Sequence, residues 1–202
     1  MQERYPGYNP ADWSLRLETC AKNADRYALC ECTGIRITAN ERKTIEAIHN
    51  KVLERLAFTL LCLAKFNDFR NPANNHWISY SNGEIYKTAC INATAFNKDS
   101  NYHRLRELGL IEYAKKVNNL NIRVLFIDEN GGEALFVSDF RTLGYEWRLL
   151  KGERYIRCTG CGLLVKDTNG KRKYCKDCAA AGKRMLDRQR MQRRRSLQIC
   201  ES

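Results

Sequence analysis

The sequence predicts an α+β fold, in which a helical domain with a helix-turn-helix and a β-hairpin precedes a small cysteine-rich module and a basic C-terminal helix. Three observations support this prediction. Apolar residues recur at helical spacing through residues 40–67, and two apolar runs flank a polar turn between residues 110 and 127. Two CxxC pairs and an arginine-rich run then fill the last quarter of the 202-residue chain.

A long apolar helix is expected from about Asn40 to Asn67. Thr38 and Glu41 fit a capping box at its start. Cys62 lies within the apolar stripe and is expected to be a buried thiol, and His49 beside the stripe is expected to be packed or partly exposed rather than a metal ligand. The stripe has three- and four-residue spacing and consists of Ile45, Ile48, Val52, Leu56, Leu60 and Leu63.

Two short helices should follow a loop at residues 68–82. The first is expected over residues 82–90 and the second over residues 96–108, with a polar turn at 92–94 between them. Two short helices joined by a tight turn indicate a helix-turn-helix. Gly109 should end the second helix. The core-facing residues of this helix are expected to be Tyr102, Leu105 and Leu108.

A β-hairpin is expected next, with strands at residues 110–117 and 121–127 and a turn at residues 118–119. A third apolar strand is expected at residues 133–137. Residues 141–154, which contain Tyr145 and Trp147, show no pattern that assigns them to an element, and we expect them to form a linker.

Four cysteines form two CxxC pairs that are separated by thirteen residues. Four thiolates at this spacing are typical of a structural zinc site, which leaves no position for a substrate. Gly162 after the second cysteine suits a turn with a positive φ, and the spacer predicts strands at residues 163–166 and 171–174 around an Asn-Gly turn. Two disulfides are the alternative, but the chain begins without a signal peptide, so we expect a reducing cytoplasm and one structural Zn²⁺. The expected ligands are Cys158, Cys161, Cys175 and Cys178.

The positive charge is concentrated at the C-terminus, where the last 45 residues carry +8 of the net charge of +12. On a helix, the basic residues would form two stripes without a clear apolar face. We expect an arm that becomes ordered on a nucleic-acid backbone, and a solvated tail is the alternative. The residues concerned are Lys183, Arg184, Arg188, Arg190, Arg193, Arg194 and Arg195.

The segment from Arg104 to Ile111, followed by a hairpin, resembles the end of the recognition helix and the start of the wing in winged-helix DNA-binding domains. The resemblance covers residues 41–127. Residues 155–182, called here the cysteine module, resemble a treble-clef zinc finger, with a zinc ribbon as the alternative. The resemblance implies an extension at 1–39, a winged-helix domain at 40–140, the linker, the cysteine module and a basic tail at 183–202.

The order of these parts is similar to that of uncharacterised small proteins of bacteriophages and other mobile elements, which implies a DNA transaction in a bacterial host. In a winged-helix domain the second helix would enter the major groove. Asn and Arg side chains suit base edges, whereas Lys and Ser side chains suit phosphates. The expected contacts are Asn97, Lys98, Ser100, Asn101 and Arg104 on the helix, and Lys115, Lys116 and Arg123 near the tip of the wing.

Three function classes remain open. The first is a protein of a phage or mobile element that binds double-stranded DNA in regulation or replication. The second is an inhibitor or adaptor, such as an anti-CRISPR that binds a Cas effector and its nucleic acid. The third is an RNA-binding zinc-finger protein.

Other functions are not expected from the sequence. There are only three histidines, and the chain has neither a phosphate-binding loop nor a GxSxG motif, so we expect no catalytic residues and no enzyme activity. No apolar stretch approaches the ~20 residues that cross a membrane. Cys20, Cys30 and Cys32 could hold a second metal with His49 or another group as the fourth ligand, although unliganded thiols are the alternative.

Overall fold

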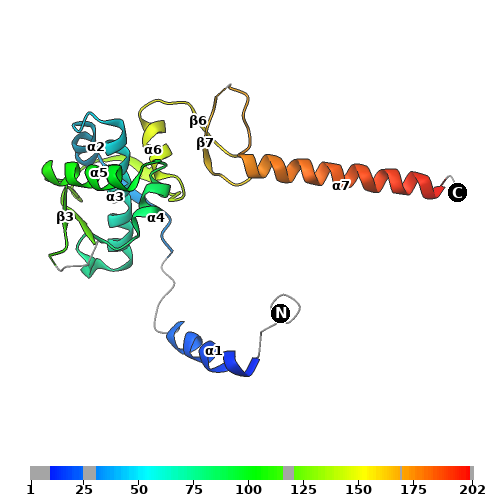
Figure 1. The fold of residues 1–202 in the computed structure, drawn as a ribbon, viewed down its shortest axis with the longest axis horizontal. Helices are drawn as coiled ribbons and strands as arrows, with labels where there is room; N and C mark the ends of the chain where they lie inside the picture. The colour runs from blue at the N-terminus through cyan, green and yellow to red at the C-terminus, as the bar shows by residue number, and fades with distance from the viewer. Residues whose placement is uncertain (1–9, 25–30, 116–120, 169, 201–202) are drawn as a thin grey trace. The chain divides into compact units, whose positions relative to one another are not determined.

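The computed structural model describes residues 10–24, 31–115, 121–168 and 170–200 (Figure 1). The chain divides into two compact units, residues 1–32 and residues 33–202. The first unit contains helix α1 (Pro10–Ala24), and the second contains every other described helix and strand. The second unit combines helices with small antiparallel sheets, so the predicted α+β class is confirmed. No described helix has the length and apolar content needed to span a membrane.

The predicted long helix is two helices, α2 (Ala39–Glu46) and α3 (Lys51–Arg70). The chain breaks between them because His49 adopts a positive φ of 52°, which interrupts a right-handed helix. Asn50 then caps α3 by accepting hydrogen bonds from the amides of Val52 and Leu53. The prediction of one continuous helix was therefore wrong at residues 47–50.

The start of α2 agrees with the prediction. The Thr38 hydroxyl accepts a hydrogen bond from the amide of Glu41, and the Glu41 carboxylate accepts one from the amide of Thr38. This reciprocal pair is the capping box that the sequence predicts. Glu41 is fully buried, and its charge is balanced by Lys65, whose Nζ lies 2.7 Å from Oε1.

Helix α3 is the centre of the core. It contacts α2 and the later helices α4 (Asn82–Thr88), α5 (Ala95–Glu107) and α6 (Leu143–Leu150). It also contacts the strands β1 (Ile35–Thr38), β2 (Trp77–Ile78) and β4 (Ile122–Val124). Its middle part, residues 56–64, is buried throughout. Cys62 is fully buried there, as predicted, and burial raises the pKa of its thiol well above the ordinary value. The other elements are therefore arranged around this one apolar helix.

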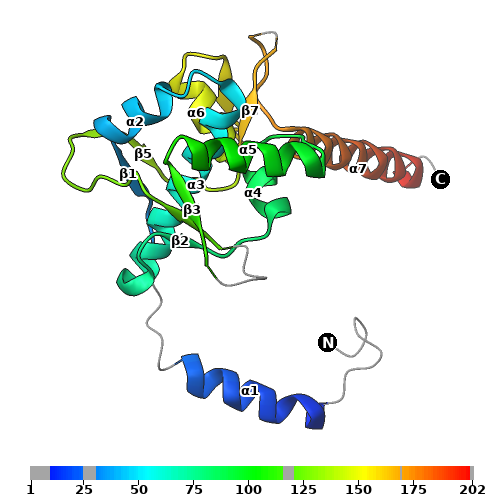
Figure 2. The same cartoon turned by 60° about the vertical axis from the view of Figure 1, so that its left-hand side comes forward.

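Two short helices and a three-stranded sheet follow α3. Helices α4 and α5 meet through an edge-to-face contact of Tyr86 and Tyr102, whose ring centres are 5.7 Å apart, and α5 contacts β3 (Figure 2). The sheet has the strand order β2-β4-β3, and both strand pairs are antiparallel. The predicted turn at residues 118–119 lies outside the described residues. The bounds are η1 Pro72–Asn74, β2 Trp77–Ile78, α4 Asn82–Thr88, α5 Ala95–Glu107, β3 Ile111–Tyr113 and β4 Ile122–Val124.

The C-terminus of α5 partly agrees with the prediction. Tyr102 and Leu105 are buried, and Gly109 ends the helix with a φ of 70°. Leu108 was expected in the core but is 53% exposed. The chain turns at Leu108 and Gly109, and the amide of Leu110 bonds to the carbonyl of Leu105. Leu110 is therefore the residue that is buried after the turn.

A second sheet pairs β1 (Ile35–Thr38) with β5 (Glu133–Val137) in antiparallel register. The strand at 133–137 was predicted, but its partner lies in residues assigned to the N-terminal extension. Ile35 and Ile37 are buried on one side of β1, and Arg36 between them is exposed. Because side chains alternate along a strand, the face of β1 that carries Ile35 and Ile37 packs against the core.

The expected linker at residues 141–154 contains helix α6 (Leu143–Leu150), which packs on α3. Trp147 is 2% exposed, and its ring centre lies 5.2 Å from that of Phe58. Its Nε1–H donates to Oε2 of Glu54 at 3.1 Å. At Gly144 a Cβ atom would lie 1.8 Å from the carbonyl oxygen of Ala89, so only glycine allows this close approach.

The last elements are β6 (Tyr155–Arg157), β7 (Leu164–Lys166) and α7 (Lys176–Cys200). The predicted strand at 163–166 is present as β7, but it pairs with β6. The predicted return strand at 171–174 is not a strand. Instead, the carbonyl of Lys173 accepts hydrogen bonds from the amide and the hydroxyl of Thr159, beside Cys158.

We predict that Trp147→Ala lowers the free energy of unfolding by ~3–5 kcal/mol, because it removes a buried ring from α3 and leaves the Glu54 carboxylate without its indole donor. Leu149→Ala is the matched control, since Leu149 lies on the same helix and is 38% exposed. Urea unfolding of the two variants measures the difference. Equal losses would show that α6 is not anchored through Trp147.

Candidate metal centre and nucleic-acid interface

The four predicted cysteine ligands come together in one cluster. Cys158 and Cys161 lie in the turn between β6 and β7, whereas Cys175 and Cys178 lie at the start of α7. All four sulfur atoms lie within 4.8 Å of one another, and those of Cys161 and Cys175 are 3.7 Å apart. Four sulfurs at ~2.3 Å from a tetrahedral ion would be separated by ~3.8 Å. The cluster can therefore hold a metal ion.

Backbone amides point toward the sulfur atoms of the cluster. The amide of Cys175 donates to Sγ of Cys158 at 3.1 Å, and the amide of Cys178 donates to Sγ of Cys175 at 3.3 Å. The bond to Cys158 favours the thiolate form of that residue. The Cys175 amide is the main reason that the pKa of Cys158 falls to about 6. Cys178 shows the opposite shift, because hydrogen bonds with the sulfur atoms of Cys175, Cys161 and Cys158 raise the pKa of its thiol to about 12. A bound metal ion would require all four cysteines as thiolates.

Glycines shape the turn between the first two cysteines. Gly162 has a φ of 71°, and its amide bonds to the carbonyl of Cys158 at 2.8 Å, which agrees with the role expected from the sequence. At Gly160 a Cβ atom would lie 3.1 Å from Sγ of Cys178. A larger residue at either position would strain or crowd the cluster.

The cysteine module is attached to the helical core. Arg141 donates through Nη2 to the carbonyl of Cys161 at 2.9 Å. Arg157 on β6 forms an ion pair of 2.9 Å with Glu146 on α6, and Glu146 is only 5% exposed. The rings of Tyr145 and Tyr155 have centres 4.9 Å apart. Polar and aromatic contacts therefore connect the module to α6.

The basic residues of the tail lie on α7, which is a single helix of 25 residues. Lys183, Arg184, Arg188, Arg190, Arg193 and Arg194 are all exposed. The side chain of Arg195 lies outside the described residues. An ion pair within the described part of this helix joins Arg190 to Asp187 at 3.7 Å, and both side chains are more than half exposed. Most of the positive charge on α7 thus faces solvent.

On α5 the five predicted contact residues fall into two groups. Asn97, Ser100 and Arg104 are exposed, whereas Lys98 and Asn101 are half-buried. The amide group of Asn101 donates to the Tyr86 hydroxyl at 3.2 Å. The Nζ atom of Lys98 lies 5.3 Å from the centre of the Tyr86 ring. These last two side chains also hold α5 against α4.

Sequence reasoning missed Phe96, which is 80% exposed near the N-terminus of α5. At 100° per residue, Phe96 lies opposite the buried Leu105, so the helical spacing could have identified it. An aromatic ring on this exposed face adds an apolar contact point to the polar residues Asn97, Ser100 and Arg104.

The predicted basic residues of the wing occupy different positions. Lys115 is exposed, and Lys116 lies outside the described residues. Arg123 is not at the tip of the hairpin, because it pairs with Glu112 on β3 and with Trp77 on β2. Its guanidinium forms an ion pair of 3.2 Å with Glu112 and bonds to Asn75. Arg123 therefore stabilises the sheet.

A second cysteine site receives no support among the described residues, where the cluster of Cys158, Cys161, Cys175 and Cys178 is the one group of three or more possible ligands that meets. Cys20 is exposed on α1, Cys32 is half-buried, and Cys30 lies outside the described residues.

Comparisons with protein families, with curated proteins and with solved structures found no match to this chain.

We predict that the purified protein binds about one metal ion per chain, because one set of four thiolates forms a complete tetrahedral site. Cys175→Ser should reduce the bound metal to a small fraction, and Cys20→Ser, which changes an exposed cysteine on α1, should leave it unchanged. Elemental analysis of the three proteins measures the metal content. Full metal content in Cys175→Ser would contradict the assignment of the site.

Proposed function

We propose that this protein binds double-stranded DNA through a winged helix-turn-helix domain, with a structural zinc module and a basic helix that adds contacts to the phosphate backbone. The observation that carries the proposal is the orientation of α5. One side of α5 is fixed by the buried Tyr102 and Leu105, whereas the other side exposes Asn97, Ser100 and Arg104. Amide and guanidinium groups on an exposed helix suit the edges of adenine and guanine.

The chain order supports the winged-helix proposal. Helix α3, strand β2, helices α4 and α5, and the β3–β4 hairpin follow one another, and β2 joins the hairpin as its third strand. This is the order expected for a winged helix-turn-helix, whose second helix enters the major groove. Lys115 at the end of β3 would then lie on the wing and contact phosphate.

The cysteine cluster supports zinc as the metal. A tetrahedral set of four thiolates suits Zn²⁺ and leaves no open position, so the metal would stabilise the fold rather than catalyse a reaction. Because α7 begins within the cluster, the metal would also fix the first turn of the basic helix. We accordingly propose no enzyme activity for this site.

A protein adaptor is the second candidate, and Phe96 is the observation that favours it. Exposed aromatic residues are frequent anchors in protein interfaces. In the DNA proposal the same ring would instead contact a thymine methyl group, which is an apolar feature of the major groove. RNA binding through the cysteine module and α7 is the third candidate, since an arginine-rich helix also suits RNA.

We predict that the protein binds duplex DNA more tightly than single-stranded DNA or RNA of the same sequence, and that Arg104→Ala weakens binding at a preferred site by ~1–3 kcal/mol. Arg106→Ala is the matched control, because Arg106 lies on the same helix but its guanidinium is 5.7 Å from the Tyr113 ring centre. Fluorescence anisotropy with a duplex selected from random sequences measures both effects.

Equal effects of the two substitutions would argue against base reading by α5. Tighter binding of RNA would favour the third candidate, and no binding of any nucleic acid would favour the adaptor.

The contribution of α7 is tested by salt dependence. We predict that truncation after Gly182 flattens the slope of log K against log salt by up to ~0.9 for each phosphate that α7 neutralises, because it removes seven basic residues. A variant in which the arginines of the tail are replaced by lysines keeps the charge and should keep the slope. An unchanged slope after truncation would show that α7 does not contact DNA.

A further inference from the structure

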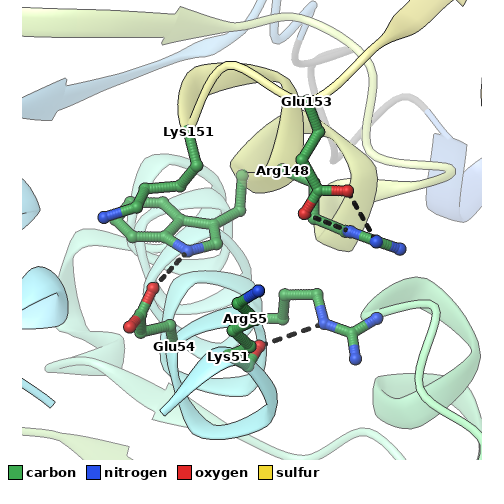
Figure 3. Close-up of a pocket in the computed structure, with 7 residues that line it drawn as sticks. Lys51, Glu54, Arg55, Arg148, Lys151 and Glu153 are labelled. Atoms are coloured by element: carbon green, nitrogen blue, oxygen red, sulfur yellow. Dashed lines mark hydrogen bonds and ion pairs between the residues drawn. The ribbon is translucent and has the colours of Figure 1, made fainter. Parts of the chain in front are cut away.

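A small cavity lies between the start of α3 and the end of α6 (Figure 3). Its volume is about 150 Å³. This is roughly five times the ~30 Å³ that one water molecule occupies, so the cavity has room for a small polyatomic ion. Its walls carry four basic and two acidic side chains and one indole: Lys51, Arg55, Arg148, Lys151, Glu54, Glu153 and Trp147.

Arg55 is the most informative residue of this cavity, because it is half-buried and its hydrogen bonds go to neutral groups. Its Nε donates to the carbonyl of Lys51 at 3.1 Å, and its Nη1 donates to the carbonyl of Cys90 at 2.9 Å. Among the described residues, no carboxylate forms an ion pair with Arg55. Burial, and then the positive charge of Arg148, lower the pKa of the Arg55 guanidinium, and the nearby Glu153 carboxylate acts in the opposite direction. The Arg55 guanidinium therefore lies near a carboxylate but forms hydrogen bonds only to carbonyl groups.

The carboxylates of the cavity are bound to other groups. Glu54 accepts the indole N–H of Trp147, and Glu153 forms an ion pair of 2.6 Å with Arg148. Figure 3 shows both contacts on the walls of the cavity, with Arg55 and Lys51 on the α3 side. The nearby Glu46 pairs with Arg42 and Lys151. Arg55 could therefore bond to an external anion without displacing a carboxylate from its guanidinium.

We propose that this cavity binds one phosphate group, held by Arg55 and Lys51 from α3 beside the Arg148–Glu153 ion pair. A guanidinium presents parallel N–H donors that match the oxygens of a phosphate, and a bound dianion would also relieve the repulsion between Arg55 and Arg148. The site involves neither α5 nor the cysteine cluster, so it goes beyond the proposed function. The phosphate could come from free inorganic phosphate or from a nucleic-acid backbone.

The test uses the full metal-loaded chain and isothermal titration with inorganic phosphate at constant ionic strength. Arg55→Gln should weaken phosphate binding at least about tenfold, since it removes a charge-assisted contact. Arg70→Gln is the matched control, because Arg70 is an exposed arginine at the opposite end of α3. It should leave the affinity unchanged.

A second variant keeps the test decisive if Arg55→Gln fails to fold. Lys51 is exposed, so Lys51→Gln should fold normally and weaken phosphate binding severalfold. The proposal is overturned if wild-type protein binds no phosphate, or if both Arg55→Gln and Lys51→Gln bind it as tightly as wild type does.

The source of the phosphate is distinguished by repeating the titration in the presence of saturating duplex DNA. Loss of phosphate binding would support a site for the nucleic-acid backbone, and unchanged binding would support a site for free phosphate. Either result agrees with phosphate binding in the cavity. Because phosphate is the only ligand in the first titration, its outcome does not depend on whether the protein binds DNA.

Discussion

The contact between Trp147 on α6 and Glu54 on α3 fixes the helix that leads into the cysteine module. A buried carboxylate is unfavourable unless it is hydrogen-bonded, and the indole N–H of Trp147 supplies a bond of 3.1 Å to Glu54. The indole ring also packs on Phe58 within α3. Because α6 leads directly into β6, this contact determines where Cys158 and the rest of the module begin. The Arg157–Glu146 ion pair and the Arg141 contact then add to the same attachment.

This attachment has a consequence for the proposed function. The cysteine cluster brings the β6–β7 turn next to the first turn of α7, and α6 links β6 to α3. An isolated helix is only marginally stable in water, and α7 is exposed from residue 183 to residue 194. The metal would therefore stabilise the start of a basic helix whose remaining length gains stability only when it meets a polyanion. Loss of the metal should weaken phosphate contacts without changing the core around α3.

Local chemistry in the sequence predicted several features correctly. The capping box at Thr38 and Glu41, the Gly109 terminator and the four cysteines each depend on residues that are near one another in the chain, so their spacing is informative. The helix-turn-helix candidates at α4 and α5 were also located to within two residues at each end. The burial of Cys62 was predicted from its position in the apolar stripe of α3.

Features that depend on distant contacts could not be predicted. Helix α6 has only eight residues and is fixed by a side chain 93 residues away, which no local pattern reveals. The pairing of β1 with β5 likewise joins residues about 100 positions apart. The break at His49 depends on one positive φ and one asparagine cap within a continuous apolar stripe. Arg123 resembled a wing residue because the hairpin register was unknown, and its bonds to Glu112 and Asn75 place it within the sheet.

The central claim is that the exposed face of α5 meets duplex DNA. A photoreactive phenylalanine analogue at position 96 tests this directly, because Phe96 is 80% exposed and its replacement should not disturb the core. The same analogue at Phe69, which is 49% exposed at the end of α3, is the control. The account predicts crosslinks to the bases of a bound duplex from position 96 and not from position 69. Crosslinks only from position 69, or none from position 96 in a complex that is fully bound, would contradict it.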